Sequence, residues 1–458
     1  MADLRITHVS VLLEDGTILK DQNVDVTGGH FSRIAPAGED SSASAACAAA
    51  SLATGTSVQN GADTVPDQTL DGRGKLLMPG LADCHMHTGQ QLLKGRVLDE
   101  LPMIWTRIML PFESTLTPEN MRLSAELAAL EMIRSGTTAF IDAGSYHMKE
   151  AVKVYRKSGL CGVLSLSTMD EKGLPASIAT TTEEAVSLAD DFYEFCKEDS
   201  RLKPAYALRS LISCSEDLIR QTSEHANERQ ALLQAHMNEY AGEVNFHLQR
   251  FQLRPYEYLD SLGVLSDRFI GAHSIILSEH EKALLRDRDV KVCHCPFSNC
   301  GKAVPDTPQL LEMGIPVGLG SDGAAHGGLS LWNEMKIFRS VMNIYHGVPN
   351  GNPKVMPAET ILKIVLEGGA AALNEEGSLG RLEAGYKADI ISINMDQPHL
   401  CPTGNKIHTL FECVNAGDVE DMIVGGRILM KNREVLSLDE ERIMYESRKY
   451  MEENADTF

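Results

Sequence analysis

Residues 76–87 read LLMPGLADCHMH, and this stretch decides the fold of the chain. Its apolar start predicts a buried strand, and its polar end marks the point where the strand stops. Successive side chains of a strand point to opposite faces, so His85 and His87 lie on the same face. Two imidazoles placed in this way can bind one cation. A metal site is therefore the first hypothesis.

A His-x-His pair also occurs by chance in surface loops, so a metal site needs further ligands elsewhere in the chain. Three later residues are candidates: His236, His273 and Asp322. Each closes or follows a short apolar run and precedes a polar or turn-like segment. A parallel barrel keeps its functional residues at this position, because the carboxyl ends of its strands meet at one face.

Length and charge narrow the class of protein. A chain of 458 residues is too long for one simple core and indicates a large domain with a smaller one. Its 42 basic and 64 acidic residues give a net charge of -22, which opposes binding to nucleic acid or to an anionic membrane. No apolar run approaches the roughly 20 residues of a membrane span, and the first residues lack the features of a signal peptide. We therefore expect a cytoplasmic protein.

The 10 cysteines are scattered along the chain, which indicates reduced thiols that are mostly buried. Three of them, Cys293, Cys295 and Cys300, lie close together in the sequence, and a Cys-x-Cys pair can bind a metal. No second cysteine pair lies nearby, so packed thiols are the favoured interpretation.

The two ends of the chain predict one small β domain. Residues 1–75 contain short strand-like runs that are broken by turn residues. Residues 37–66 are rich in alanine, serine, glycine and threonine, which predicts a flexible insertion, with a short helix as the alternative for its alanine-rich part. Strand-like runs return in residues 385–437, and we expect them to complete the same β-sandwich.

Residues 76–384, between these two halves, alternate short apolar runs with longer amphipathic stretches such as 182–196. Repeated strand-then-helix units indicate a parallel sheet covered by helices. About eight units in roughly 300 residues predict a closed (β/α)8 barrel of the TIM type. Residues 438–458 are charged and predict a C-terminal helix on the outside of the molecule.

Five motifs in this order resemble those of the metal-dependent amidohydrolase superfamily, in its branch of nucleobase and nucleoside deaminases and triazine hydrolases. They are PGLxDxHxH from residue 79, HxxE from residue 236, His273, CHCPxSN from residue 293 and GSDG from residue 320. The resemblance covers nearly the whole chain, including the split β domain. Chance agreement of all five motifs is negligible, so the resemblance implies the barrel fold and a hydrolytic activity.

The resemblance implies one divalent ion with four ligands, which are His85, His87, His236 and Asp322. The chemistry agrees, because three neutral imidazoles and one carboxylate suit Zn²⁺ or Fe²⁺ and leave room for a water. Zn²⁺ is the expected cofactor and Fe²⁺ is the alternative. A core histidine satisfied by the backbone explains any one of these residues well, but it explains all of them together poorly.

The resemblance also implies catalytic roles for Glu239, His273 and Asp322. Glu239 lies three residues beyond His236, where a carboxylate near the ion can take a proton from the attacking water and pass it to the leaving nitrogen. The alternative for Glu239 is a solvent-facing loop carboxylate. We expect His273 to orient the water and stabilise developing charge, while Asp322 shares the proton transfer.

Two further histidines have no assigned role. His294 lies in the CHCPxSN segment and either shapes the site or makes structural hydrogen bonds. His326 follows the GSDG motif, and a position in a turn is favoured over a position that faces the pocket.

Three residues are candidates for substrate binding: Trp105, Glu113 and Arg209. The first two match positions in enzymes that resemble methylthioadenosine/S-adenosylhomocysteine deaminase, where an aromatic ring can cover the heterocycle and a glutamate can accept hydrogen bonds from a ribose diol. Packing and helix capping are their alternatives. Arg209 stands where those enzymes have a histidine and resembles guanine deaminases, since a guanidinium suits a ring acceptor. No arginine near residues 164–167 matches a carboxylate-binding residue, which argues against S-adenosylhomocysteine itself.

We therefore predict a hydrolytic deaminase that releases ammonia from an amino-substituted N-heterocycle, such as a purine base, an adenosine derivative or a pterin. The alternative enzyme displaces chloride or an alkylamine from a triazine on the same scaffold. A non-catalytic binding protein is a third class, which the complete ligand set and Glu239 argue against. The expected partners are the small-molecule substrate and further copies of the chain in a homodimer or larger homo-oligomer, with no nucleic acid and no membrane.

Overall fold

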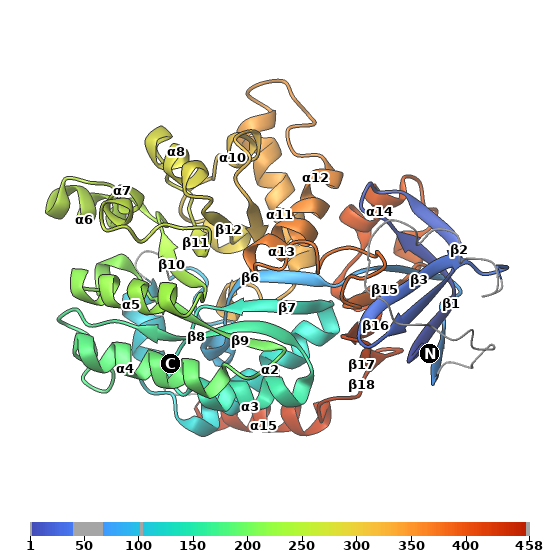
Figure 1. The fold of residues 1–458 in the computed structure, drawn as a ribbon, viewed down its shortest axis with the longest axis horizontal. Helices are drawn as coiled ribbons and strands as arrows, with labels where there is room; N and C mark the ends of the chain where they lie inside the picture. Colours follow the sequence, from blue (N-terminus) through green and yellow to red (C-terminus); the bar gives the residue numbers. More distant parts are fainter. Residues whose placement is uncertain (1, 40–66, 101–103, 455–458) are drawn as a thin grey trace, which may run out of the picture.

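The computed structural model describes residues 2–39, 67–100 and 104–454 and contains two large β-sheets (Figure 1). One sheet forms the barrel, and the other is built from both ends of the chain. The two sheets lie side by side, with most of the helices around the barrel. The predicted insertion at residues 37–66 lies outside the described residues from residue 40 onward.

The barrel sheet has nine strands, and every pairing in it is parallel. In chain order these strands are β6 (Leu81–His87), β7 (Thr137–Asp142), β8 (Cys161–Thr168), β9 (Leu202–Leu208), β10 (Leu233–Met237), β11 (Phe269–His273), β12 (Lys291–His294), β13 (Val317–Leu319) and β14 (Asp322–Gly323). β13 pairs with β12 and β14 pairs with β6, and only Gly320 and Ser321 separate β13 from β14. These two short strands share one position, so the sheet closes on itself and the predicted (β/α)8 barrel is confirmed.

The break between β13 and β14 draws the last strand tightly against β6. Ser321 donates two hydrogen bonds to the buried Asp83 of β6, from its backbone N to Oδ1 over 3.1 Å and from its Oγ to Oδ2 over 2.5 Å. Gly320 leaves no room for a side chain, because a Cβ there would lie 2.7 Å from the backbone O of His85. Gly320 and Ser321 therefore allow the chain to pass close to His85, and this places Asp322 beside His85.

Helices cover the outside of the barrel and alternate with its strands (Figure 1). The helices of the described residues are α1 (Leu110–Glu113), α2 (Pro118–Ser135), α3 (Met148–Ser158), α4 (Thr182–Cys196), α5 (Glu216–Glu228), α6 (Ala241–Phe251), α7 (Pro255–Ser261), α8 (Glu279–Asp287), α9 (Pro296–Asn299), α10 (Thr307–Glu312), α11 (Leu331–Met342), α12 (Ala358–Lys363), α13 (Gly369–Ala372), α14 (Lys406–Cys413) and α15 (Glu440–Glu453). The predicted helix at 182–196 is confirmed as α4, which begins with a capping box between Thr181 and Glu184. Within the described ranges, no helix combines the length and the apolar character that a membrane span requires.

α15 lies within the predicted C-terminal helical segment at residues 438–458 and packs against α2. Arg442 of α15 forms an ion pair with Glu126 of α2 over 2.6 Å. Arg122 of α2 pairs in turn with Glu446 of α15 over 2.9 Å. Partly exposed ion pairs of this kind stabilise a fold only modestly, but two of them in opposite directions fix the register of the helix against the barrel.

The second sheet joins the two chain ends into one structure of nine strands. Its strands are β1 (Leu4–Leu12), β2 (Ile18–Thr27), β3 (His30–Pro36), β4 (Gln68–Asp71), β5 (Lys75–Pro79), β15 (Ile390–Asn394), β16 (Val419–Val424), β17 (Arg427–Lys431) and β18 (Glu434–Val435). The halves meet at β5, which pairs with β1 in parallel and with β15 in the antiparallel sense. The expected β domain is thus one continuous mixed sheet, and the chain passes from it into the barrel at Gly80.

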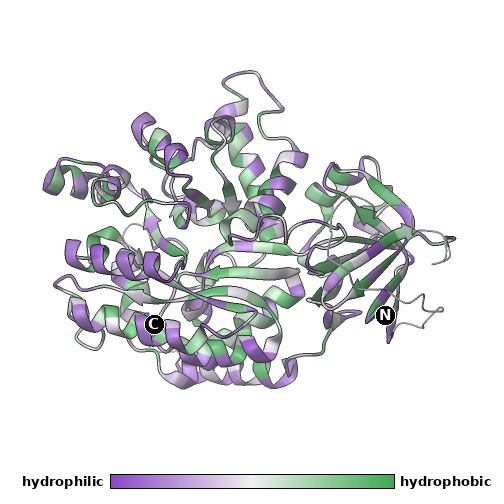
Figure 2. Cartoon of the chain, in the orientation of Figure 1, coloured by the Kyte–Doolittle hydropathy of each residue, from purple (hydrophilic) through white to green (hydrophobic). Residues whose placement is uncertain are grey.

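Apolar side chains fill the space between the barrel strands and their helices. Figure 2 shows the hydrophobic residues concentrated on the strands, while the outer faces of the helices are hydrophilic. Trp332 of α11 is fully buried in this core, and its Nε1 donates to the backbone O of Ser135 over 2.9 Å. This packing fixes the strands, and therefore the polar residues at their carboxyl ends.

Candidate active site

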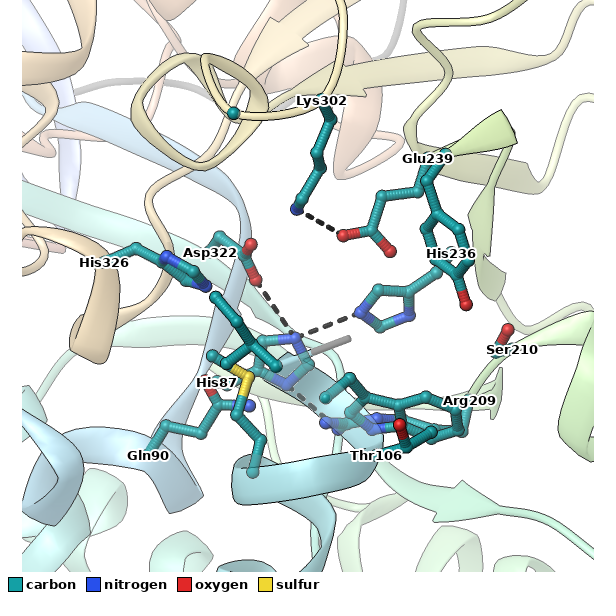
Figure 3. Close-up of a pocket in the computed structure, with 15 residues that line it drawn as sticks. His87, Gln90, Thr106, Arg209, Ser210, His236, Glu239, Lys302, Asp322 and His326 are labelled. Atoms are coloured by element: carbon teal, nitrogen blue, oxygen red, sulfur yellow. Dashed lines mark hydrogen bonds and ion pairs between the residues drawn. The ribbon is translucent and has the colours of Figure 1, made fainter. Parts of the chain in front are cut away.

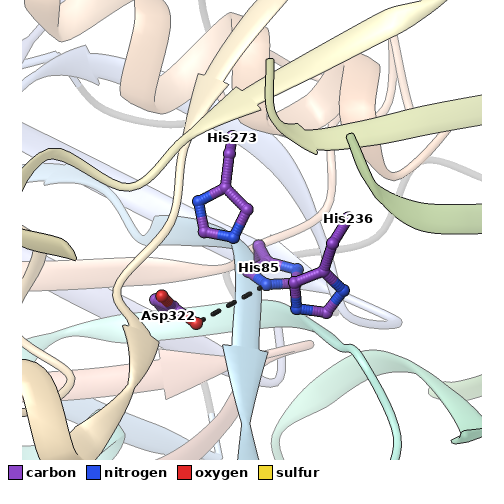
Figure 4. A group of neighbouring side chains, drawn as sticks. All are labelled: His85, His236, His273 and Asp322. Atoms are coloured by element: carbon purple, nitrogen blue, oxygen red, sulfur yellow. Dashed lines mark ion pairs between the residues drawn. The ribbon is translucent and has the colours of Figure 1, made fainter. Parts of the chain in front are cut away.

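Four histidines and one aspartate meet at the carboxyl end of the barrel. The strands supply His85 and His87 from β6, His236 from β10, His273 from β11 and Asp322 from β14. His85 Nε2 lies 3.7 Å and His87 Nε2 lies 3.3 Å from Asp322 Oδ1, while the Nε2 atoms of His87 and His236 are 3.1 Å apart. Figure 4 shows three of these imidazoles turned toward one another and toward Asp322. The structure thus brings together every residue that the sequence suggested as a metal ligand.

The donor atoms of this cluster fit a divalent cation. Four residues each place one ligand atom within 4.8 Å of the others, namely His85, His236, His273 and Asp322. His85 Nε2 and His273 Nε2 are buried and have no hydrogen-bond partner among the described residues. Burial and the neighbouring imidazoles lower the pKa of His85 and of His236 well below the usual histidine range, which favours the neutral form that binds metal. Imidazole nitrogens with one carboxylate oxygen are a typical donor set for zinc.

Arg209, which follows β9, contacts the cluster through His87 and is held by Glu113. Its Nη1 lies 3.1 Å from Nδ1 of His87, and its Nη2 donates to Oε1 of Glu113 over 2.8 Å. The buried Glu113 also accepts hydrogen bonds from Gln90 Nε2 over 2.9 Å and from Ser145 Oγ over 3.1 Å. Arg209 and Gln90 line the cavity described below, whereas Glu113 lies behind them with its carboxylate occupied by three donors.

Glu239 lies in the turn that follows β10. The backbone N atoms of Asn238 and Glu239 donate to the carboxylate of Glu243 over 3.2 and 2.9 Å, which fixes this turn. Oε1 of Glu239 lies 3.6 Å from Nε2 of His273 and accepts a hydrogen bond from Nζ of Lys302. Burial raises the pKa of Glu239, but His273 and Lys302 more than offset this and bring the pKa below its usual value. The carboxylate is therefore held in its ionised form beside the cluster.

A cavity of about 270 Å³ opens onto the cluster (Figure 3). Its apolar wall contains Ile104, Trp105 and Met109, of which the last two belong to the π-helix η2 (Trp105–Met109). Its polar residues include His87, Arg209, His236, Glu239, Lys302 and Asp322. Two of the residues suggested for substrate binding, Trp105 and Arg209, therefore face the cavity. An apolar wall opposite a few polar groups suits a flat organic molecule.

The two histidines without an assigned role occupy different places. His294 is buried, and its Nδ1 lies 2.7 Å from the backbone O of His273, so it supports the cluster from behind. Burial lowers the pKa of His294 to about 4. His326 lines the cavity. Both cysteines that flank His294 are buried free thiols.

Sequence reasoning missed three residues of the site: Gln90, Ser145 and Lys302. Gln90 and Ser145 both donate hydrogen bonds to the carboxylate of Glu113. No motif or spacing in the sequence connects Gln90 or Ser145 with Glu113. Lys302 contacts Glu239, although the two residues are 63 positions apart. The only sequence signal for Lys302 is its position three residues after the end of the CHCPxSN motif. That signal is weak, because lysines are common in polar loops.

The fold and the site define a barrel enzyme with its chemistry at the carboxyl ends of the strands. The chain belongs to the amidohydrolase family, whose profile matches residues 76–429. It is 32% identical over 397 residues to the 5-methylthioadenosine/S-adenosylhomocysteine deaminase of Syntrophobacter fumaroxidans, which covers 86% of this chain and 89% of that protein. It is 33% identical over 465 residues to the 5'-deoxyadenosine deaminase of Methanosarcina acetivorans, which covers 99% of this chain and 98% of that protein.

A solved structure supports the same fold. The crystal structure of an adenosine deaminase from Xanthomonas campestris with bound zinc matches this structure with a TM-score of 0.87. The match covers 99% of this chain and 98% of that chain at 24% sequence identity. Both the barrel and the mixed sheet therefore belong to an architecture already seen in the crystal.

Proposed function

We propose that the protein is a metal-dependent hydrolytic deaminase, which converts an amino-substituted N-heterocycle into the corresponding oxo compound and ammonia. The observation that carries this proposal is the position of Glu239, whose carboxylate lies beside the histidine–aspartate cluster and lines the same cavity. A base at that position can serve both the attacking water and the leaving nitrogen. The deaminase names of the two sequence relatives support this class of reaction.

The proposed substrate is an adenosine derivative. Both relatives are named for such compounds, and the cavity wall formed by Trp105 suits a flat purine ring. Arg209 offers its guanidinium to an acceptor on that ring. Glu113 already accepts hydrogen bonds from three donors, so we assign it the role of holding Arg209 in place rather than binding a ribose.

The proposed cofactor is one Zn²⁺ ion with four ligands, which are His85, His87, His236 and Asp322. His87 is included because its Nε2 lies 3.3 Å from Asp322 Oδ1 and 3.1 Å from His236 Nε2, and His273 is assigned to the substrate side of the cluster. Such an ion would supply Lewis acidity, which favours loss of a proton from the attacking water. Glu239 takes a proton from the attacking water and delivers it to the exocyclic nitrogen while the C–O bond forms and the C–N bond breaks. His273 faces the same point and stabilises the charge that develops on the ring carbon's new oxygen. Ammonia then leaves with the electron pair of the C–N bond.

A substrate panel with the Zn²⁺-loaded protein tests this proposal. The panel contains adenosine, 5'-deoxyadenosine, methylthioadenosine, guanine, a pterin, an aminotriazine and a chlorotriazine, with ammonia and chloride as the measured products. We expect one ammonia per molecule of an adenosine derivative. Chloride release from the triazine with every aminated ring inert would identify the alternative enzyme. No turnover of any compound by protein with stoichiometric zinc would leave only a binding function.

We also propose that the chain forms a homodimer or a larger homo-oligomer. One segment exposes three large side chains to solvent, since Ile344, Tyr345 and Val348 are 71%, 58% and 74% exposed. A second copy of the chain would remove such an apolar patch from water. Light scattering at micromolar concentration measures the mass directly, and a monomer under these conditions would contradict the proposal.

A further inference from the structure

Lys302 is a partly buried cation with no role in the proposed reaction. Its side chain is 13% exposed and lines the cavity beside Glu239. Nζ of Lys302 donates hydrogen bonds to Oε1 of Glu239 and, over 2.8 Å, to Oγ of Ser298. An ammonium removed from water needs such partners, so these two contacts hold the lysine in one position.

The segment that carries Lys302 also contacts His273. It consists of α9 and the loop after it, and the backbone N of Lys302 donates to the backbone O of Asn299, the last residue of α9, over 2.8 Å. The side-chain amide of Asn299 lies 3.0 Å from Nδ1 of His273. One short segment after β12 therefore positions groups against both His273 and Glu239.

The two carboxylate oxygens of Glu239 have different surroundings. Oε1 accepts the hydrogen bond from Lys302 and lies 3.6 Å from Nε2 of His273. No group among the described residues donates a hydrogen bond to Oε2 of Glu239. Figure 3 shows Lys302 on one oxygen, while the other oxygen is directed into the cavity. The geometry thus separates an anchored oxygen from one that can carry a proton.

We propose that Lys302 is a positioning residue for proton transfer, which holds Oε1 of Glu239 so that Oε2 carries the proton from the attacking water to the leaving nitrogen. This inference rests on the proposed deaminase function. In that reaction the nitrogen takes the proton from Oε2, the C–N bond breaks, and ammonia leaves with the electron pair of the bond.

A chloride leaving group makes a different demand on Glu239. Chloride departs as an anion with the electron pair of the C–Cl bond and needs no proton. The proton that Glu239 has taken from the attacking water then passes to solvent. Exact placement of Oε2 therefore matters for an amine and much less for a chloride.

The test compares an adenosine derivative with its 6-chloro analogue in Zn²⁺-loaded wild type and variants. In Lys302→Met, which has a neutral side chain of similar length, we expect kcat for the amine to fall about 10- to 100-fold, part of the total general acid–base contribution. The kcat for the chloride should fall about 3-fold or less, with KM for both compounds and the zinc content unchanged. Lys302→Arg keeps the positive charge and should lower the amine rate by a smaller factor than Lys302→Met.

Two further variants complete the design. Lys94→Met is the matched control, because Lys94 pairs with Glu131 and lines only a neighbouring cavity. Its kinetics should equal those of the wild type. Ser298→Ala removes the second partner of Nζ and should lower the amine rate by a smaller factor than Lys302→Met, and again more than the chloride rate. This variant decides the question if Lys302→Met does not fold.

The possible outcomes separate this inference from the proposed function. Unchanged amine turnover, or equal losses for both leaving groups, would overturn the role of Lys302 while the deaminase activity stands. A raised KM with unchanged kcat would assign Lys302 to substrate binding and overturn the inference as well. Wild-type protein that releases neither ammonia nor chloride would contradict the proposed function, and with it this inference.

Discussion

Asp421 in the mixed sheet and the histidine cluster in the barrel are both buried, but their polar atoms have different surroundings. Asp421 accepts hydrogen bonds from Nζ of Lys75 over 2.7 Å and from Oγ of Ser392 over 2.6 Å. At the barrel end, His85 Nε2 and His273 Nε2 have no hydrogen-bond partner among the described residues. The chain itself supplies the partners of the Asp421 carboxylate, whereas the cluster leaves two imidazole nitrogens without a hydrogen-bond partner side by side at one point.

This difference separates polar groups that serve the fold from polar groups that serve chemistry. A buried polar atom without a partner destabilises a fold by about 1–3 kcal/mol, so native chains rarely retain several of them in one place. A group of unused nitrogens around one carboxylate is therefore expected where a ligand completes the bonding. Substitutions in the mixed sheet should therefore change stability, and substitutions at the barrel end should change activity.

Removal of the metal should have the largest effect and should be confined to the barrel. We expect a chelator to reduce ammonia release below detection, and one equivalent of Zn²⁺ to restore it. Binding of the ion to the folded state should also raise the free energy of unfolding, by about 2.7 kcal/mol at a free ion concentration of 100 times Kd. Metal analysis, ammonia assays and thermal unfolding measure these changes. Full activity in protein shown to be metal-free would contradict the inference that the unpartnered nitrogens of the barrel bind a metal ion.

Glu239→Gln should separate catalysis from metal binding within the barrel. The amide cannot take up the proton, so we expect kcat to fall about 10²- to 10⁴-fold while the zinc content stays the same. Glu224→Gln is the matched control, because Glu224 is exposed on α5. Wild-type rates in Glu239→Gln would remove this residue from the mechanism, and loss of zinc would make it a ligand instead.

Asp421→Ala should show the opposite behaviour, with lost stability and intact chemistry. The substitution leaves Lys75 half-compensated by Glu420, whose Oε1 lies 3.2 Å from Nζ. We expect the free energy of unfolding to fall by about 3 kcal/mol, near the lower end for a broken buried pair. Denaturant unfolding measures the loss, and kcat per folded molecule should not change. A changed kcat would show that the mixed sheet affects catalysis in the barrel, and would contradict the separation of stability from activity.

Glu375→Gln should have the smallest effect and should depend on pH. Burial raises the pKa of Glu375, but hydrogen bonds from Lys203, Lys387 and Ser378 lower it to about 2, below its ordinary value of 4.5. Because the folded pKa lies below the unfolded one, this carboxylate stabilises the fold above about pH 4.5, and the contribution is lost as the pH falls toward 2.

The effect at Glu375 is measured as the difference in unfolding free energy between wild type and variant. We expect about 1 kcal/mol at pH 6, reduced by solvent screening, and a difference that shrinks toward zero below pH 3. A difference that stays constant over this range would show that the loss comes from packing rather than from the charge.

The sequence by itself determined the barrel and the strand ends that carry the chemistry. A two-residue alternation puts His85 and His87 on one face of a strand, and the period of the amphipathic stretch gives the bounds of α4. These features depend on neighbours a few residues apart, so local backbone geometry is enough to predict them. The family motifs also predict the remaining members of the cluster, which are His236, His273 and Asp322.

Only the tertiary structure decided which side chains touch each other. The split at Gly320 and Ser321 closes the barrel, Glu113 turns toward Arg209 instead of the cavity, and Lys302 reaches Glu239. Such contacts join loops that follow different strands, and their geometry is set by how the loops fold over the barrel end. The periodicity of the sequence does not predict these contacts. Side chains that are far apart in the sequence become partners through packing and charge, and their spacing along the chain does not determine which of them meet.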